Sequence, residues 1–286
     1  ICNYEYNTPF CTIQMSNEAN VGGSIINLNN WSFYNCKTSN NTGVSLYTSQ
    51  RITFTSCSWY NNSVSNGNGG AFHIYNLDVS FINCQFIENS AYNGGALAIS
   101  NVLNTIYITN CTFSSNQATQ NGGAIYFFIS RSSDNNKTIT ISNCTFSGCR
   151  SNSGGALYIN SAIEVRLEGV NRFECCSATQ YGSILALQSK TTFFDLPSTT
   201  IIENQNDGSQ FLIYCYLQDF RCYNLNLTNN ITQNCFYIYG DNGHTELNSI
   251  HFENVAQAIY ICNIAENTEV LDCTFYNCHP SSTDSI

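Results

Sequence analysis

Residues 84–125 read CQFIENSAYNGGALAISNVLNTIYITNCTFSSNQATQNGGAI and contain two copies of the same pair of short motifs. The first motif is Cys-x-aromatic-x-x-Asn, at residues 84–89 (CQFIEN) and 111–116 (CTFSSN). The second is Gly-Gly-Ala-aliphatic, at residues 94–97 and 122–125. A motif pair that recurs at a fixed spacing indicates a repeat protein, whose fold follows from its period.

The repeat extends in both directions from this stretch. The first motif recurs at residues 57–62 (CSWYNN), and at 144–149 and 273–278 with Cys in its last position. Aligning on the aromatic position predicts eleven copies, with the step of 33 residues between Phe113 and Phe146 explained by a protruding polar loop at 131–137. The aligned positions are Ile13, Phe33, Trp59, Phe86, Phe113, Phe146, Phe173, Ile201, Leu227, Phe252 and Phe275.

Within each copy the apolar residues alternate with a period of two, as in residues 106–108 (IYI) and 139–141 (ITI). This pattern indicates strands, and no amphipathic helical pattern is found. A period in the mid-twenties with short strands predicts an all-β, single-stranded parallel β-helix. We expect one solenoid domain over residues 1–286, with about eleven coils of roughly 23–28 residues. Its repeats are clearest at 54–160 and irregular at 190–235.

Equivalent residues of adjacent coils stack above one another in such a fold. The aromatic positions Trp59, Phe86, Phe113 and Phe146 are therefore predicted to form a ladder of stacked rings. Asn62, Asn89 and Asn116 are predicted to form an asparagine ladder, and the Gly-Gly pairs to allow tight bends with positive φ. These residues are interpreted as structural rather than catalytic.

The chain has sixteen cysteines, no Cys-x-x-Cys pair and scattered histidines, which favours disulfides over structural zinc. Stacked strands bring Cα atoms close enough for disulfides, so the pairs predicted are Cys57–Cys84, Cys111–Cys144 and Cys149–Cys176. Cys84–Cys111 is a competing pair, and the alternative is a ladder of packed free thiols. No pairing is assigned to Cys2, Cys36, Cys175, Cys215, Cys222, Cys235, Cys262, Cys273 and Cys278.

The cysteine content predicts an oxidising, extracellular location, and N-glycosylation sequons agree with it. The chain starts at Ile1 without a signal peptide, so we expect a mature or trimmed product. Asn136 on the inserted loop is the preferred glycan site, and at most one of the neighbouring Asn110 and Asn143 is expected to be occupied. The sequons lie at Asn136, Asn40, Asn61, Asn30, Asn226, Asn230, Asn110 and Asn143.

Charge is sparse in this chain, at 10% of residues, and the net charge is −10. Without a basic stripe a nucleic-acid partner is excluded, and no apolar run is long enough to insert into a membrane. Neither a cofactor nor a metal site is expected. The densest charge cluster, around Glu164, Arg166 and Glu168, alternates along a strand and is interpreted as a solvent-exposed face.

The Gly-Gly-Ala-Ile motif at 122–125 and the Phe-x-x-Asn motif at 113–116 resemble the repeats of chlamydial polymorphic outer membrane proteins. Similar repeats occur in large surface proteins of protists. The resemblance implies a pectin-lyase-like, right-handed β-helix and a role in adhesion. The cysteine before the aromatic residue departs from the usual bacterial repeat, and no autotransporter-type barrel follows.

Three functions remain open. The favoured one is a non-enzymatic structural glycoprotein, a surface or filament building block that assembles head to tail, because both ends of the chain carry motif-like coils. The other interpretation of these ends is that further parts of a longer chain cap them. The alternative is a cell-surface adhesin that binds other surface proteins or glycans. The third is a polysaccharide lyase or hydrolase, which lacks support because the chain has no cluster of carboxylates and basic residues for such chemistry.

Overall fold

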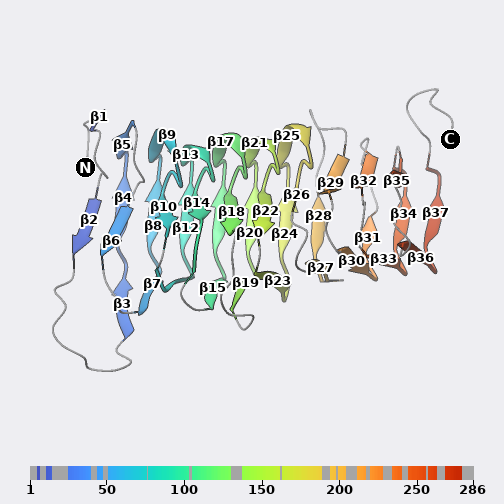
Figure 1. The fold of residues 1–286 in the computed structure, drawn as a ribbon, viewed down its shortest axis with the longest axis horizontal. Helices are drawn as coiled ribbons and strands as arrows, with labels where there is room; N and C mark the ends of the chain where they lie inside the picture. The colour runs from blue at the N-terminus through green and yellow to red at the C-terminus, as the bar shows by residue number, and fades with distance from the viewer. Residues whose placement is uncertain are drawn as a thin grey trace.

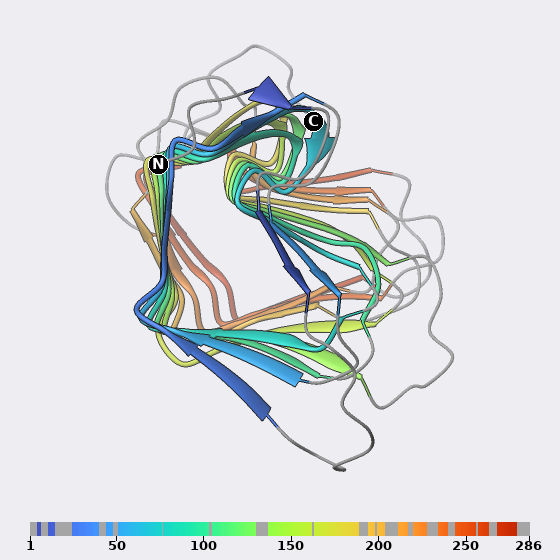
Figure 2. The same cartoon turned by 90° about the vertical axis from the view of Figure 1, so that its left-hand side faces the viewer.

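The structure, a computed structural model, consists of short parallel strands that wind into a solenoid (Figure 1). It describes residues 5–6, 11–14, 25–39, 44–47, 51–75, 77–102, 105–129, 137–161, 163–188, 194–197, 199–203, 211–216, 220–227, 234–239, 244–255, 257–262 and 268–278. No helix occurs in these residues, so none of them forms a helix that could span a membrane. Seen from the N-terminal end, the strands of successive coils superpose (Figure 2).

The strands line up in four rows, which we call faces A to D. Face A contains β1 (Glu5–Tyr6), β5 (Lys37–Thr38), β9 (Ser63–Asn68), β13 (Ser90–Asn93), β17 (Gln117–Asn121), β21 (Arg150–Ser153) and β25 (Ser177–Tyr181). Face B contains β2 (Cys11–Gln14), β6 (Val44–Tyr47), β10 (Phe72–Ile74), β14 (Leu97–Ile99), β18 (Ile125–Ile129), β22 (Leu157–Ser161), β26 (Leu185–Leu187), β29 (Phe211–Tyr216), β32 (Asn234–Tyr239) and β35 (Ile259–Cys262).

Faces C and D each consist of two sheets in line. Face C contains β3 (Ile25–Asn29), β7 (Arg51–Thr55), β11 (Val79–Ile82), β15 (Ile106–Thr109), β19 (Thr138–Ser142) and β23 (Glu164–Glu168), then β27 (Phe194–Leu196), β30 (Phe220–Tyr223), β33 (Thr245–Asn248) and β36 (Thr268–Leu271). Face D contains β4 (Ser32–Tyr34), β8 (Ser58–Tyr60), β12 (Gln85–Ile87), β16 (Thr112–Ser114), β20 (Thr145–Ser147), β24 (Arg172–Glu174) and β28 (Ile201–Glu203), then β31 (Asn226–Leu227), β34 (His251–Glu253) and β37 (Thr274–Tyr276).

This architecture confirms the all-β parallel solenoid, but the predicted number of eleven coils is wrong. The longest sheet of the described strands, on face B, stacks ten strands. Ile13 was aligned with the aromatic positions, yet it lies on face B opposite Leu46. Ile202 rather than Ile201 lies opposite Phe173 on face D. Both errors arose because an aliphatic residue fits the spacing on either strand when the rest of the motif is missing.

Two backbone corners enclose the short strand of face D in each regular coil. Asn110 and Ser115, on either side of β16, both have φ 54°, and Asn83 and Glu88 occupy the same positions around β12. Left-handed residues are usually glycine, which lacks a Cβ, or asparagine, whose short polar side chain tolerates this conformation. Each corner turns the chain sharply, so that a three-residue strand can form one side of the coil.

The Gly-Gly-Ala motif directly follows four strands of face A, namely β9, β13, β17 and β21. The first glycine has positive φ, 63° at Gly94. A Cβ on the second, Gly95, would lie 2.2 Å from the carbonyl oxygen of Gly123 in the next coil. Both glycines are therefore required where the chain leaves face A. The last degenerate copy begins at Gly182, directly after β25, which is the last strand of face A.

Candidate assembly site

The aromatic positions of face D form a continuous stack inside the solenoid. Ring centroids are 4.8 Å apart between Trp59 and Phe86 and between Phe86 and Phe113, and 4.9 Å apart between Phe113 and Phe146. The interplanar angles are 7° or less in these three pairs. The four side chains are fully buried. Stacked rings at this spacing gain energy beyond the burial of their area, so the ladder is a structural core.

A second ladder consists of the buried amides of Asn62, Asn89 and Asn116. The Nδ2 atom of Asn89 donates to Oδ1 of Asn116 at 3.1 Å and to the carbonyl of Trp59 at 3.0 Å. Its Oδ1 accepts hydrogen bonds from the backbone N–H and the Nδ2 of Asn62. Each amide thus satisfies backbone groups that the corner leaves without strand partners.

The structure does not support the predicted disulfides. Its fourteen described cysteines form no disulfide; Cys2 and Cys11 lie outside the residues whose side chains are described. The predicted partners do stack: Cys57, Cys84, Cys111 and Cys144 occupy successive coils in one column, as free buried thiols. Cys149 and Cys176 stack in the column of the asparagine ladder, with their thiols in hydrogen-bond contact. The described columns therefore match the alternative prediction, a ladder of packed thiols.

These thiols form the same contacts as the amides. Sγ of Cys57 accepts a hydrogen bond from the backbone N–H of Trp31 at 3.4 Å and donates to the carbonyl of Leu28 at 3.3 Å. Burial raises the pKa of Cys57. Hydrogen bonds with the neighbouring thiols of Cys144 and Cys84, and then burial, raise the pKa of Cys111. Hydrogen bonds with Cys111 lower the pKa of Cys84 and Cys144. All four thiols are buried, so reagents in solvent do not reach this column in the folded chain.

Several predicted glycan sites are exposed at the corners of face D. Asn30, Asn61, Asn110 and Asn143 have positive φ and exposed side chains. Asn226 is exposed on β31. Asn40, Asn136 and Asn230 lie outside the described residues.

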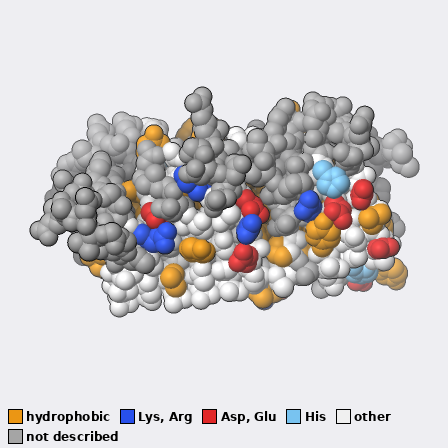
Figure 3. Space-filling view, turned by 60° about the horizontal axis from the view of Figure 1, so that its bottom comes forward, with side chains coloured by type: hydrophobic (Ala, Val, Ile, Leu, Met, Phe, Trp, Pro, Cys, Tyr) orange, Lys and Arg blue, Asp and Glu red, His pale blue; other side chains and the backbone are white. Residues whose placement is uncertain are grey.

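The charge cluster lies on the solvent side of β23, where Val165 and Leu167 point into the core and Glu164, Arg166 and Glu168 point outward. Arg166 pairs with Glu164 at 2.7 Å. Figure 3 shows acidic and basic side chains lying beside one another in small groups on this side of the molecule. Within the described part of the chain, no three His, Cys, Asp or Glu side chains are placed to hold a metal ion.

The last described coil, which we call the tail, exposes side chains whose equivalents in the preceding coil face the core. Phe275 stacks on Phe252 at 5.1 Å, yet it is 53% exposed, whereas Phe252 is fully buried. Val270, whose equivalent in the preceding coil is the buried Leu247, is 41% exposed. Cys273 and Cys278 are half-buried. The tail is thus a cross-section of the apolar core.

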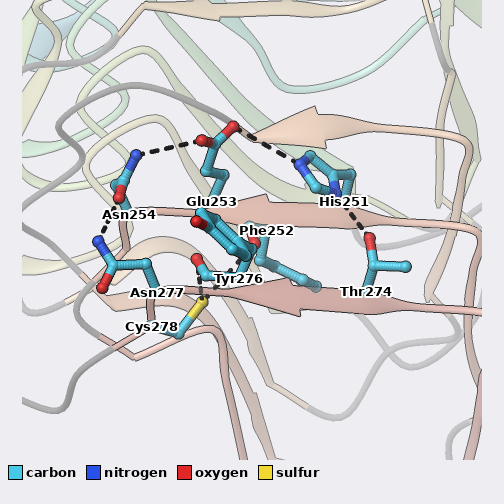
Figure 4. Close-up of polar contacts among 8 residues, drawn as sticks. All are labelled: His251, Phe252, Glu253, Asn254, Thr274, Tyr276, Asn277 and Cys278. Atoms are coloured by element: carbon cyan, nitrogen blue, oxygen red, sulfur yellow. Dashed lines mark hydrogen bonds and ion pairs between the residues drawn. The ribbon is translucent and has the colours of Figure 1, made fainter.

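Polar side chains of the last two coils surround this end on face D (Figure 4). The Nδ1 atom of His251 lies 2.6 Å from Oγ1 of Thr274, and its Nε2 lies 3.7 Å from a carboxylate oxygen of Glu253. This order of hydroxyl, imidazole and carboxylate can relay a proton. However, Thr274 is exposed and His251 is only half-buried, so water reaches this group. We therefore interpret it as a polar border of the tail.

Two sets of paired asparagines were not predicted from the sequence. Asn68, Asn93 and Asn121 form a third ladder, with amide-to-amide hydrogen bonds of 3.0 Å, and the signal was the asparagine directly before three of the Gly-Gly pairs. Corner asparagines also pair between coils, as Asn61 Nδ2 donates to Asn35 Oδ1 at 2.8 Å. No local signal distinguishes these corners from ordinary turn residues.

Searches against protein-family models, curated proteins and solved structures gave no match for this chain. The resemblance to polymorphic outer membrane protein repeats therefore rests on the motifs alone, and the fold rests on the structure.

Proposed function

We propose that this chain is a non-enzymatic structural building block of a surface or filament, which assembles head to tail through the ends of its solenoid. The observation that carries the proposal is the exposed Phe275, the last ring of a ladder whose other described rings are mostly buried. Core residues left in water lower stability, and a second solenoid end stacked on them would bury this apolar surface. A heterologous contact of this kind generates open filaments.

The proposal includes an extracellular location with N-linked glycans. The exposed sequons at the corners of face D support it, because glycans there would project away from the core and leave the ends accessible. With thiols in place of disulfides, the cysteines no longer support an oxidising compartment. If enzymatic removal of N-glycans leaves the mass of the native protein unchanged, glycosylation is excluded.

Sedimentation velocity and negative-stain microscopy of the purified chain test the assembly. We expect oligomers that grow with concentration, and filaments with an axial repeat of about 48 Å, from ten coils at the strand spacing. Phe275→Asp places a charge on the tail and should weaken association at least tenfold. Tyr107→Asp is the matched control, because Tyr107 is an exposed aromatic residue on face C, away from both ends.

Val270→Asp is a second tail variant, so that the result does not depend on one position. Circular dichroism of both variants must show the wild-type strand content, since only folded variants report on the interface. A wild-type chain that remains monomeric at high concentration, or tail variants that assemble like the control, would contradict the proposal.

A further inference from the structure

We infer that the tail of one copy stacks on the N-terminal end of the next, the head, in a single register that pairs β37 with β4. The inference rests on the proposed function, because it specifies the surfaces that would meet. The two strands lie at opposite ends of face D (Figure 1).

The strongest support is that these two strands have nearly the same sequence. Residues 32–36 read SFYNC and residues 274–278 read TFYNC. The segments between them differ, as in SWYNN at 58–62 and QFIEN at 85–89. In a parallel stack equivalent positions lie directly opposite, so like residues form ladders. If the two ends stack, each ladder residue of the tail therefore lies opposite a like residue of the head.

The contacts that each strand forms inside its own chain show which contacts would continue across the interface. Phe33 stacks on Trp59 at 5.3 Å, and Tyr34 lies 6.0 Å from Tyr60. In the same register, Phe275, which is 53% exposed, lies opposite Phe33 of the next copy, which is only 9% exposed in the single chain, so Phe33 must be uncovered before the two rings stack. Tyr34 meets Tyr276, and these two tyrosines are 45% and 65% exposed.

The corner amides have a direction that is preserved in this arrangement. Asn61 Nδ2 donates to Asn35 Oδ1, and Asn277 Nδ2 donates to Asn254 Oδ1 at 2.5 Å, so the later coil donates to the earlier one. Asn35 of the next copy would donate in the same sense to Oδ1 of Asn277. Asn35 and Asn277 both have φ 52°, so the backbone at the two corners already matches.

Faces B and C fit the same shift, whereas face A ends at β25 and has no described strand at the tail for β1. At the tail, β36 and β37 follow β35 in the chain, so faces C and D extend one level beyond face B. At the head, β2 precedes β3 and β4, so face B extends one level beyond faces C and D. When a second copy is placed ten coils further along the solenoid axis, its β2 lies beside β35 of the first copy and its β3 lies beside β36. Its β4 then lies beside β37. On faces B, C and D the two ends are complementary steps.

Disulfide trapping between copies tests the register. Tyr34→Cys and Tyr276→Cys are made as separate variants, mixed in equal amounts and oxidised with diamide, which takes two electrons and two protons from the two thiols. Peptide mapping by mass spectrometry identifies the crosslink among the native cysteines. Tyr107→Cys is the control, and wild-type protein shows the background of native thiols. Circular dichroism confirms that each variant is folded.

We expect a covalent dimer linked through positions 34 and 276 in the mixture, and no such dimer with either variant alone. A dimer from Tyr276→Cys alone indicates a tail-to-tail contact, and one from Tyr34→Cys alone a head-to-head contact; each overturns the inference. Wild-type assembly without the 34–276 crosslink overturns the register but leaves the proposed function standing. A wild-type chain that does not assemble overturns both.

Discussion

Cysteine and asparagine occupy equivalent positions in the two buried columns beside face D. Asn171 takes the place of cysteine one coil after Cys144, and its Nδ2 donates to the carbonyl of Ile141. Cys149 takes the place of asparagine one coil after Asn116, and its Sγ donates to the carbonyl of Phe113 at 3.5 Å. Both side chains carry a donor and an acceptor, although the thiol is the weaker of the two. This equivalence explains why so many cysteines form no disulfide.

Because Asn89 lies in the middle of the asparagine ladder, we expect a single substitution there to lower the free energy of unfolding strongly. Asn89→Ala leaves buried backbone and amide groups of two neighbouring coils without partners, and should lower the free energy of unfolding by about 2–4 kcal/mol. Asn89→Cys should lower the free energy of unfolding by less, because the thiol of Cys149 already takes the place of the amide in this column. Urea unfolding measures both. Asn83→Gly, at an exposed left-handed corner, is the control and should change stability by about 0.5 kcal/mol or less. A loss for Asn89→Ala no greater than this would contradict the role of the ladder.

His73 on face B predicts a specific dependence of stability on pH. Burial lowers the pKa of His73 to about 4, and its Nε2 lies 2.7 Å from Oγ of Ser100. Below pH 6.5 the unfolded chain therefore binds a proton that the folded chain does not. The contribution is fully present above pH 6.5, and stability decreases by up to about 3 kcal/mol as the pH falls toward 4.

Thermal unfolding of wild type and His73→Gln at pH 7 and pH 4.5 measures this effect. The variant should lose less stability than wild type between the two pH values, because the remaining titratable groups are common to both proteins. Equal losses in the two proteins would show that His73 titrates normally in the folded state.

At the scale of elements, the corner between faces A and B depends on the close approach of successive coils. A Cβ at Gly95 would meet the carbonyl of Gly123 and, at 2.6 Å, the backbone N of Gln117. These are backbone atoms of the next coil, so neither can move without breaking the stack. The motif is therefore a requirement of stacking rather than of the turn alone.

Gly95→Ala should destabilise the solenoid by about 3 kcal/mol or more, or prevent folding, because the clash cannot be relieved by rotating a side chain. Gly148→Ala is the matched control. Its φ is 61°, but a Cβ there would lie 3.6 Å from the nearest atom, so the cost should be about 1–2 kcal/mol from backbone strain alone. Chemical denaturation compares the two, and equal effects would show that the strained φ dominates at both glycines.

At the scale of the whole molecule, the described strands form one continuous sheet along the solenoid only on face B. Face A ends at β25, and faces C and D are each divided into two sheets. Among the described residues, the coils after β26 therefore have strands on three faces instead of four. This change coincides with the region that the sequence shows as irregular, where the Gly-Gly-Ala motif is lost.

The buried thiol columns predict how the cysteines of the folded chain react with an alkylating reagent. Cys57, Cys84, Cys111 and Cys144 should resist alkylation in the native protein, since they are buried, whereas the exposed Cys175 should react. After unfolding without a reductant, all five should be alkylated. Mass spectrometry of the peptides measures which cysteines are alkylated. A Cys57–Cys84 or Cys111–Cys144 disulfide in the unreduced chain would show that the pairing predicted from the sequence is correct.

The sequence by itself determined the parallel solenoid, the column of Trp59 and Phe86, and the column of Asn62 and Asn89, because stacked coils repeat the same environment and so select the same residues. It failed at Ile13 and Ile201, because an isolated aliphatic residue satisfies the period on more than one face.

Only the tertiary structure decided which residues end up on the surface of each end. Phe252 and Phe275 have equivalent local sequences, and one is buried and the other exposed solely because a further coil covers the first. The similarity of residues 32–36 and 274–278 was present in the chain from the start. Its meaning depends on both segments lying at opposite ends of one face, which is a property of the stack and not of either segment.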